Sequence, residues 1–137
     1  MKVQKVKLQM IIEDTKDCQE TIKAPIDAVN FINKYERYDL APTENLIVIG
    51  LNIRNKIIYS QVSMGGVNST FITPADIFKA LLVSNCSKFI LVHNHPSGDA
   101  TPSKEDIELT KNMDIAAGIL GLTLLDHIII GNNDYTS

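Results

Sequence analysis

The sequence predicts an α/β fold in which helices flank a mixed β-sheet. Short apolar runs, of the length of buried strands, alternate with longer segments whose apolar residues recur at helical spacing. Turn-forming residues separate these segments. With 137 residues, of which 45% are hydrophobic and 21% charged, the chain fits a single globular domain over residues 1–137.

The amino-terminal part predicts a strand and then a short helix. In residues 1–13 alternate side chains are apolar, so an extended chain there has one hydrophobic face. These side chains are Val6, Leu8, Met10 and Ile12. After a polar loop, Pro25 opens a helix, because proline is favoured in the first helical turn. Its apolar side carries Ala28, Phe31 and Ile32. Residues 35–43 are polar and predict a connection.

The middle of the chain predicts a β-hairpin and a second helix. Residues 44–52 form a strand whose Leu-Ile-Val-Ile run implies burial on both faces, and residues 57–63 run back after a turn. Thr73 and Pro74 begin a helix as N-cap and first helical residue. That helix runs to about Ser84. We expect it to bury Ile77, Phe78, Ala80, Leu81 and Leu82.

The last third predicts a strand, a turn, a long helix and a final strand. Residues 88–93 are a buried strand, and residues 94–101 are all turn formers. A helix follows to about Leu120, and Gly121 stops it. Residues 122–130 form the last strand. The apolar positions of the long helix are Ile107, Ile115, Ala116 and Ile119.

Composition excludes several classes of protein. Thirteen basic and sixteen acidic side chains give a net charge of −3, which argues against strong binding of nucleic acid through bulk charge. No apolar run approaches the roughly 20 residues of a membrane span, and the start of the chain lacks the pattern of a signal peptide. Cys18 and Cys86 lie far apart in sequence and form no metal knuckle. We therefore expect a cytoplasmic protein without a disulfide framework.

The stretch HNHPSGDATPSKED carries the clearest chemical signal. His93 and His95 end a buried strand, and their spacing of two turns both imidazoles to the same side. Asp106 follows in the first turns of the next helix, which a short loop can fold back over the strand end. Two imidazoles, one carboxylate and one open position describe a catalytic zinc site, since a structural site has four protein ligands. A polar loop that binds nothing is the alternative.

The position of Ser103 allows two interpretations, a catalytic one and a structural one. It lies three residues before Asp106, so its hydroxyl can share a face with that carboxylate and donate to a developing oxyanion at the open position. The same spacing is a capping box, a structural helix start. Thr101 offers a competing cap, which would release Asp106 from capping.

A hydrolase also needs a base, and Glu44 is the best candidate. It opens the strand 44–52 directly ahead of an apolar run, although a solvated charge at a strand end is the alternative. For the other polar groups we prefer structural roles. His127 is read as a hydrogen-bonded core histidine, with Asp126 as a possible partner for it, and Asp99 as a turn residue. Cys86 is read as a small apolar residue.

Together these residues resemble the RadC-like branch of the JAB/MPN (JAMM) zinc metalloprotease superfamily. The family motif is a distant Glu, then H-x-H, seven residues, Ser, two residues and Asp, and the spacing here matches it throughout. The flanking TPADIFKALL and LLDHIIIG also resemble that branch, and the resemblance covers about two-thirds of the chain. RadC proteins usually place a helix-hairpin-helix region ahead of this domain, and we expect none here.

The resemblance implies a cytidine-deaminase-like JAB/MPN fold with Zn²⁺ held by His93, His95 and Asp106. It implies Glu44 as the catalytic acid/base and Ser103 as the residue that steadies the water or oxyanion. The expected function is that of a peptidase or isopeptidase with a protein or peptide substrate. The chain could form a homodimer. We expect neither membrane binding nor strong nucleic-acid binding. The alternative is a RadC-type DNA repair or recombination factor. A nucleobase deaminase would need a CxxC pair that is missing, and a metal-free scaffold would not fill all five motif positions.

Overall fold

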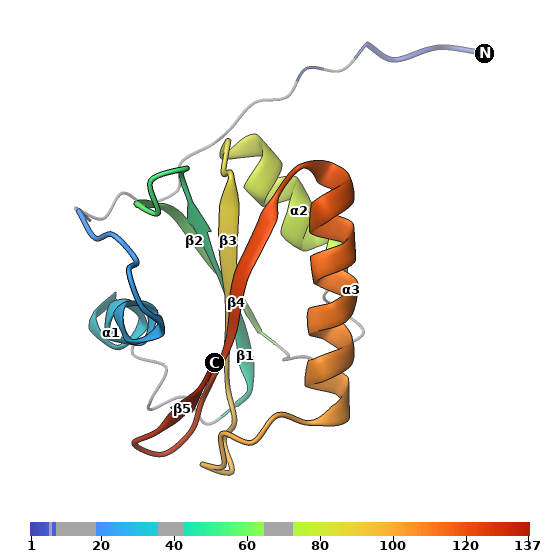
Figure 1. Cartoon of the computed structure of the whole chain (residues 1–137). Coiled ribbons are helices and arrows are strands. Elements are labelled where there is room, and N and C mark those ends of the chain that lie inside the picture. Colours follow the sequence, from blue (N-terminus) through green and yellow to red (C-terminus); the bar gives the residue numbers. More distant parts are fainter. Residues whose placement is uncertain (6, 8–18, 36–42, 65–72) are drawn as a thin grey trace.

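A five-stranded mixed sheet lies between two helical layers (Figure 1). The computed structural model describes residues 1–5, 7, 19–35, 43–64 and 73–137. The strand order is β2-β1-β3-β4-β5. In chain order the elements are α1 (Pro25–Tyr35), β1 (Asn45–Leu51), β2 (Ile57–Met64), α2 (Pro74–Val83), β3 (Lys88–Asn94), α3 (Lys104–Leu120), β4 (Thr123–Ile130) and β5 (Tyr135–Thr136).

Strand directions confirm the predicted α/β class with a mixed sheet. β1 is antiparallel to both β2 and β3, whereas β3 and β4 are parallel and are joined through α3. The short β5, which the sequence analysis did not anticipate, pairs antiparallel with the end of β4. The carboxyl ends of β3 and β4 and the start of β1 therefore lie at one edge of the sheet.

Each face of the sheet carries its own apolar cluster. α1 covers one face and packs its buried Ala28, Phe31 and Ile32 against Ile47, Ile49 and other residues of the central strands. On the other face, α2 and α3 lie over Leu46, Phe89 and Leu91. All seven residues of β1 are buried, as a strand covered on both faces requires. Cys86 is buried in the second cluster, as expected for a small apolar residue.

On that second face, the predicted burial is confirmed for most of α2 but not for α3. In α2, Ile77, Phe78 and Leu81 are buried, but Ala80 is only partly covered and Leu82 is 50% exposed. In α3 the prediction was wrong for the isoleucines: Ile107, Ile115 and Ile119 are exposed, and Ala116 is partly buried. The buried residues of α3 are Asp106, Met113 and Ala117.

The predicted strand in residues 1–13 depends on Val6, Leu8, Met10 and Ile12, which lie outside the described residues; residues 1–5 and 7 form no regular element. Cys18 and most of the connection 35–43 also lie outside them. Among the described helices, none combines the length and the apolar character that crossing a membrane would require.

Candidate metal centre

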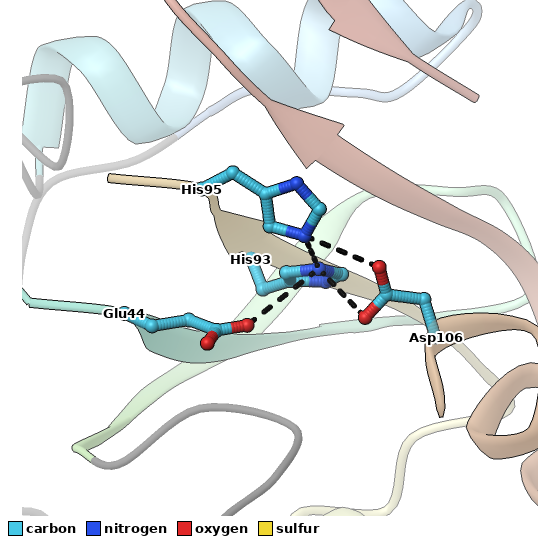
Figure 2. A group of neighbouring side chains, drawn as sticks. All are labelled: Glu44, His93, His95 and Asp106. Atoms are coloured by element: carbon cyan, nitrogen blue, oxygen red, sulfur yellow. Dashed lines mark hydrogen bonds and ion pairs between the residues drawn. The ribbon is translucent and has the colours of Figure 1, made fainter. Parts of the chain in front are cut away.

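Sheet pairing brings the predicted site residues together at one edge. His93 is the penultimate residue of β3 and lies opposite Leu46 of β1. Because β1 runs antiparallel to β3, Glu44, two residues before Leu46, comes to the same edge as His95. The N-terminus of α3 returns to this edge and adds Asp106 (Figure 2). Glu44, His93, His95 and Asp106 each offer a ligand atom, and these atoms all lie within 4.8 Å of one another.

Three of these side chains form the tightest group. The Nε2 atoms of His93 and His95 are 2.9 Å apart. Asp106 faces both rings, with Oδ1 at 3.1 Å from Nε2 of His93 and Oδ2 at 3.2 Å from Nε2 of His95. Ligands at 2.0–2.1 Å from a tetrahedral zinc are about 3.3 Å apart. The observed separations are close to that spacing.

Asp106 combines helix capping with its place in the cluster. Ser103, and not Thr101, is the N-cap of α3: its hydroxyl accepts from the backbone N–H of Asp106 at 3.1 Å. In return, Oδ2 of Asp106 accepts from the backbone N–H of Ser103 at 2.8 Å. The capping box therefore does not withdraw Asp106 from the site. It fixes the carboxylate in front of the imidazoles.

The loop after β3 is hydrogen-bonded to the end of β4, and this contact orients His95. The backbone N–H of His95 donates to the carbonyl of Ile130 at 3.0 Å, and its Nδ1 lies 2.7 Å from the carbonyl oxygen of Asp99. Gly98 has a positive φ of 85°, and a Cβ there would lie 2.9 Å from the side chain of Asn132. Glycine is thus required by both conformation and space. The Asp99 carboxylate binds the N–H of Thr101, so it is a turn residue as predicted.

Glu44 stands farther from the imidazoles than Asp106 does. Its Oε1 is 3.9 Å from Nε2 of His93, and its side chain is 28% exposed. Asn94, which the sequence predicted to be a turn former, is hydrogen-bonded to the residues on either side of Glu44. Its amide oxygen accepts from the N–H of Asn45 at 2.7 Å, and its amide nitrogen donates to the carbonyl of Thr43 at 3.0 Å.

Burial and hydrogen bonding set the charge states in the cluster. Burial, with a smaller contribution from neighbouring His127, lowers the pKa of His93 to about 4, so this imidazole is neutral at pH 7. Burial alone would raise the pKa of Asp106. The hydrogen bond from the backbone of Ser103 and the nearby His93 outweigh it and hold that pKa below its usual range. Neutral imidazoles and an ionised carboxylate are the forms that bind metal.

The donor chemistry fits a divalent cation. The carbonyl of Asp99 can only accept, so Nδ1 of His95 carries a proton, and Nε2 is the nitrogen left to present a lone pair to a metal. That lone pair converges with the Asp106 carboxylate and with Nε2 of His93. Close acceptors repel one another unless a proton or a cation lies between them. Two imidazoles and a carboxylate are zinc ligands, and a cation satisfies all three groups together.

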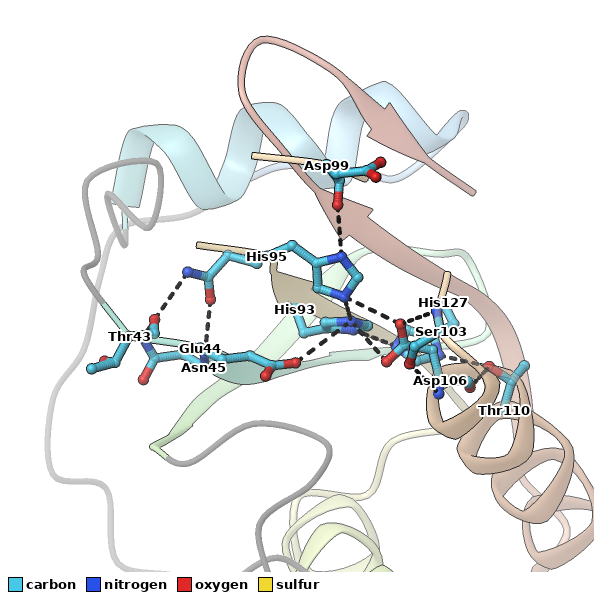
Figure 3. A network of polar contacts seen from close by, with 11 residues as sticks. Thr43, Glu44, Asn45, His93, His95, Asp99, Ser103, Asp106, Thr110 and His127 are labelled. Carbon is cyan, nitrogen blue, oxygen red and sulfur yellow. Dashed lines mark hydrogen bonds and ion pairs between the residues drawn. The ribbon is translucent and has the colours of Figure 1, made fainter. Parts of the chain in front are cut away.

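Two further polar residues extend the cluster behind His93 (Figure 3). Nε2 of His127 lies 2.8 Å from Nδ1 of His93, and Nδ1 of His127 lies 2.7 Å from the hydroxyl of Thr110. His127 is hydrogen-bonded and partly buried, which agrees with the prediction of a structural histidine. Asp126, however, binds the backbone N–H of His127 and not its ring. Thr110 was missed; its position four residues after Asp106, on the same helix face, was the available signal.

An open groove of about 510 Å³ adjoins the cluster between α3 and β4. Its lining includes Asp106, Ile107, Thr110, Leu125 and His127. The groove reaches the cluster on the Asp106 side, whereas Glu44 lies on the other side of the imidazoles. Of the four cluster residues, only Asp106 lines this groove.

Comparison with known proteins gives one consistent result. Residues 22–137 match the family model of the RadC-like JAB domain. A UPF0758 protein of Caldanaerobacter subterraneus is 43% identical over 113 residues, which cover 82% of this chain and 48% of that protein. UPF0758 proteins of Bacillus pumilus and Syntrophomonas wolfei are each 38% identical, over 90% and 96% of this chain and 54% and 53% of theirs. The chain thus spans about half the length of these relatives.

Proposed function

Since this chain belongs to the family of RadC-like JAB domains, we propose that it is a zinc-dependent hydrolase that cleaves an amide bond, as a peptidase or isopeptidase. One observation carries the proposal. Two imidazoles and the Asp106 carboxylate converge at 2.9–3.2 Å, while a second carboxylate, Glu44, stands back at 3.9 Å from His93. This leaves three ligands and a separate acid/base, the arrangement of a hydrolytic site.

In this proposal each group has one task. His93, His95 and Asp106 would hold the zinc, which when bound polarises a carbonyl and lowers the pKa of a coordinated water toward about 7. Glu44 accepts a proton from the attacking water and returns it to the leaving nitrogen. Ser103 keeps its own hydroxyl proton after accepting from Asp106, so it can donate to the carbonyl oxygen as negative charge develops there.

The substrate in this proposal is a protein or peptide. The open groove beside Asp106 offers an accessible surface with the apolar side chains of Ile107 and Leu125 and the polar ones of Thr110 and Lys111. Such a mixed lining suits a polypeptide segment. The alternative role in DNA repair receives no support from charge, because acidic residues outnumber basic ones.

The test combines metal content with hydrolysis. Protein purified without added metal is analysed for zinc and assayed against quenched fluorescent peptide libraries that include lysine isopeptide bonds. We expect one zinc per chain and cleavage that a chelator stops and zinc restores. Glu44→Gln is the control for contaminating proteases, and it should keep zinc and lose cleavage. Cleavage that survives both chelation and Glu44→Gln would reject the proposal.

A further inference from the structure

His127 and Thr110 have no task in the proposed chemistry, yet His127 contacts Nδ1 of His93 and Thr110 contacts His127. His127 comes from β4, where it lies beside Leu91 of β3, and Thr110 comes from the second turn of α3. Their side chains link three elements in one row: Nδ1 of His93 to Nε2 of His127 at 2.8 Å, and Nδ1 of His127 to the Thr110 hydroxyl at 2.7 Å. The Thr110 hydroxyl also lies 2.8 Å from the backbone carbonyl of Asp106.

Two directions are open to this row, because the single hydroxyl proton of Thr110 can be donated to the backbone carbonyl of Asp106 or to Nδ1 of His127. In the first direction the proton goes to the carbonyl of Asp106, which only accepts. Nδ1 of His127 must then donate to Thr110, which leaves Nε2 of a neutral His127 as an acceptor. Nε2 of His127 therefore accepts a hydrogen bond from the N–H at Nδ1 of His93. Nε2 of His93 then carries no proton, and its lone pair faces the cluster.

The reverse direction has a different consequence. If Thr110 donated to His127, Nε2 of His127 would donate to Nδ1 of His93, and the proton of His93 would sit on Nε2. That proton would lie 2.9 Å from Nε2 of His95 and 3.1 Å from Asp106, in the space where a metal would bind. Only the first direction is compatible with a metal, and it is the one that uses the Asp106 carbonyl.

We propose that His127 and Thr110 are positioning residues that hold His93 with Nε2 free for the metal. The proposal rests on the proposed zinc site. The row starts and ends on Asp106: its backbone carbonyl takes the Thr110 proton, and its carboxylate faces Nε2 of His93. It therefore fixes the two ligands relative to each other. His93 is fully buried, so water cannot replace His127 as the partner of its Nδ1.

The other imidazole of the cluster, that of His95, also has a hydrogen-bond partner on its Nδ1. Nδ1 of His95 is held by the backbone carbonyl of Asp99, which no side-chain substitution removes. His93 has only side chains for this purpose. Substitution at His127 should therefore affect one imidazole selectively, which makes the proposal testable.

The experiment measures zinc affinity by competition with a chelating dye on metal-stripped protein. His127→Leu removes the acceptor and Thr110→Val removes the hydroxyl at nearly constant volume. Loss of an outer partner of a metal-binding histidine weakens metal affinity by about 10–100-fold, and we expect that range for both. Thr110→Ser keeps the hydroxyl and should stay within about threefold of the wild type. Asp126→Asn is the matched control: Asp126 accepts hydrogen bonds from the backbone N–H of His127 and from the hydroxyl of Ser137, both outside the row, so this variant should leave zinc affinity unchanged.

A second measurement reads the direction without relying on a variant. Long-range nitrogen–proton NMR of the zinc-loaded wild type should place the proton of His127 on Nδ1. A proton on Nε2 of His127 would overturn the proposal, as would unchanged zinc affinity in a folded His127→Leu protein. If the wild type itself takes up no zinc, the proposed function fails and this inference fails with it. Zinc uptake by the wild type with equal affinity in His127→Leu rejects the positioning role alone.

Discussion

The carboxylate of Asp106 accepts a hydrogen bond from the backbone N–H of Ser103 at 2.8 Å through the same oxygen that lies 3.2 Å from the imidazole of His95. The start of α3 and the candidate metal centre therefore share one side chain. An N3 carboxylate is common in a capping box, but here it is 2% exposed and faces two histidines. Folding of the helix start and assembly of the cluster are coupled through this residue.

The first prediction concerns metal stoichiometry. We expect one zinc per chain in the wild type and less than a tenth of an equivalent in His93→Ala, because that change removes a buried ligand. Elemental analysis after gel filtration measures this. His95→Ala, at a ring that is 16% exposed, should give the same loss with less effect on folding. A full equivalent of zinc in either folded variant would show that the ligands are wrongly assigned.

The second prediction separates a base from a fourth ligand. Glu44→Gln should retain zinc with affinity within about threefold of the wild type, because Glu44 stands farther from His93 than Asp106 does. Turnover should fall by about 10²–10⁴-fold, the usual contribution of a general base. Zinc titration and a peptide cleavage assay measure the two effects. Loss of zinc along with activity would make Glu44 a ligand.

The sequence predicted the site residues that lie close together along the chain better than those that strand pairing brings together. His93, His95, Ser103 and Asp106 lie within fourteen residues, so strand and helix periods place them. Glu44 is far from these residues in sequence and reaches them only through the pairing of β1 with β3. Its assignment to the site came from the family motif. Asn94 and the ring contact of His127 act across elements, and spacing along the chain does not reveal them. Thr110 could have been found from its spacing of four residues from Asp106.

The buried face of α3 was predicted wrongly for a physical reason. Hydrophobic spacing favours burying Ile107, Ile115 and Ile119, but all three are exposed. The rotation of the helix is fixed instead by Asp106 and Thr110, which must face the histidines, and Met113 and Ala117 follow on the same side. The same face of α3 thus carries the contacts to the histidines and the packing of Met113 and Ala117 in the apolar cluster, and the three isoleucines lie outside it.

The third prediction concerns the pH dependence of stability in metal-free protein. Burial lowers the pKa of His93 to about 4 and also lowers that of His127, whereas an unfolded histidine titrates near 6.5. Between about pH 6.5 and 4 the unfolded chain binds protons that the folded protein does not. Stability should therefore be fully present above pH 6.5 and fall toward pH 4. Thermal melting across this range measures the slope, and His93→Asn should reduce it. A melting temperature that rises on acidification would contradict the prediction.

The fourth prediction concerns nucleic acid. The net charge is −3, and the thirteen basic residues form no run along the sequence that would serve as a patch. DNA binding by this chain should be weak and should disappear at modest salt. A gel-shift titration at about 50 and 200 mM salt measures both properties. Tight binding that resists the higher salt would favour the DNA repair alternative over the hydrolase.

The last prediction concerns Ser103, which caps α3 and is also proposed to assist the reaction. Its hydroxyl accepts from the backbone N–H of Asp106 at 3.1 Å, so Ser103→Ala removes an N-cap and should cost about 1 kcal/mol of stability. If the hydroxyl also donates to the developing oxyanion, turnover should fall by about 10²-fold or more while zinc stays bound. Melting, zinc content and cleavage rate, measured on the same preparation, distinguish these effects.

Two comparisons make the Ser103 result decisive. Ser103→Thr keeps the hydroxyl and should retain most of both stability and turnover, since threonine is also a good N-cap. Thr73→Ala removes the equivalent capping hydroxyl of α2, which likewise binds the N–H of the third helical residue, Asp76. It should cost similar stability without changing the rate, because nothing places Thr73 in the cluster. If Ser103→Ala behaves like Thr73→Ala, with lower melting and unchanged turnover, Ser103 serves the helix alone and the oxyanion must be stabilised by the metal without it.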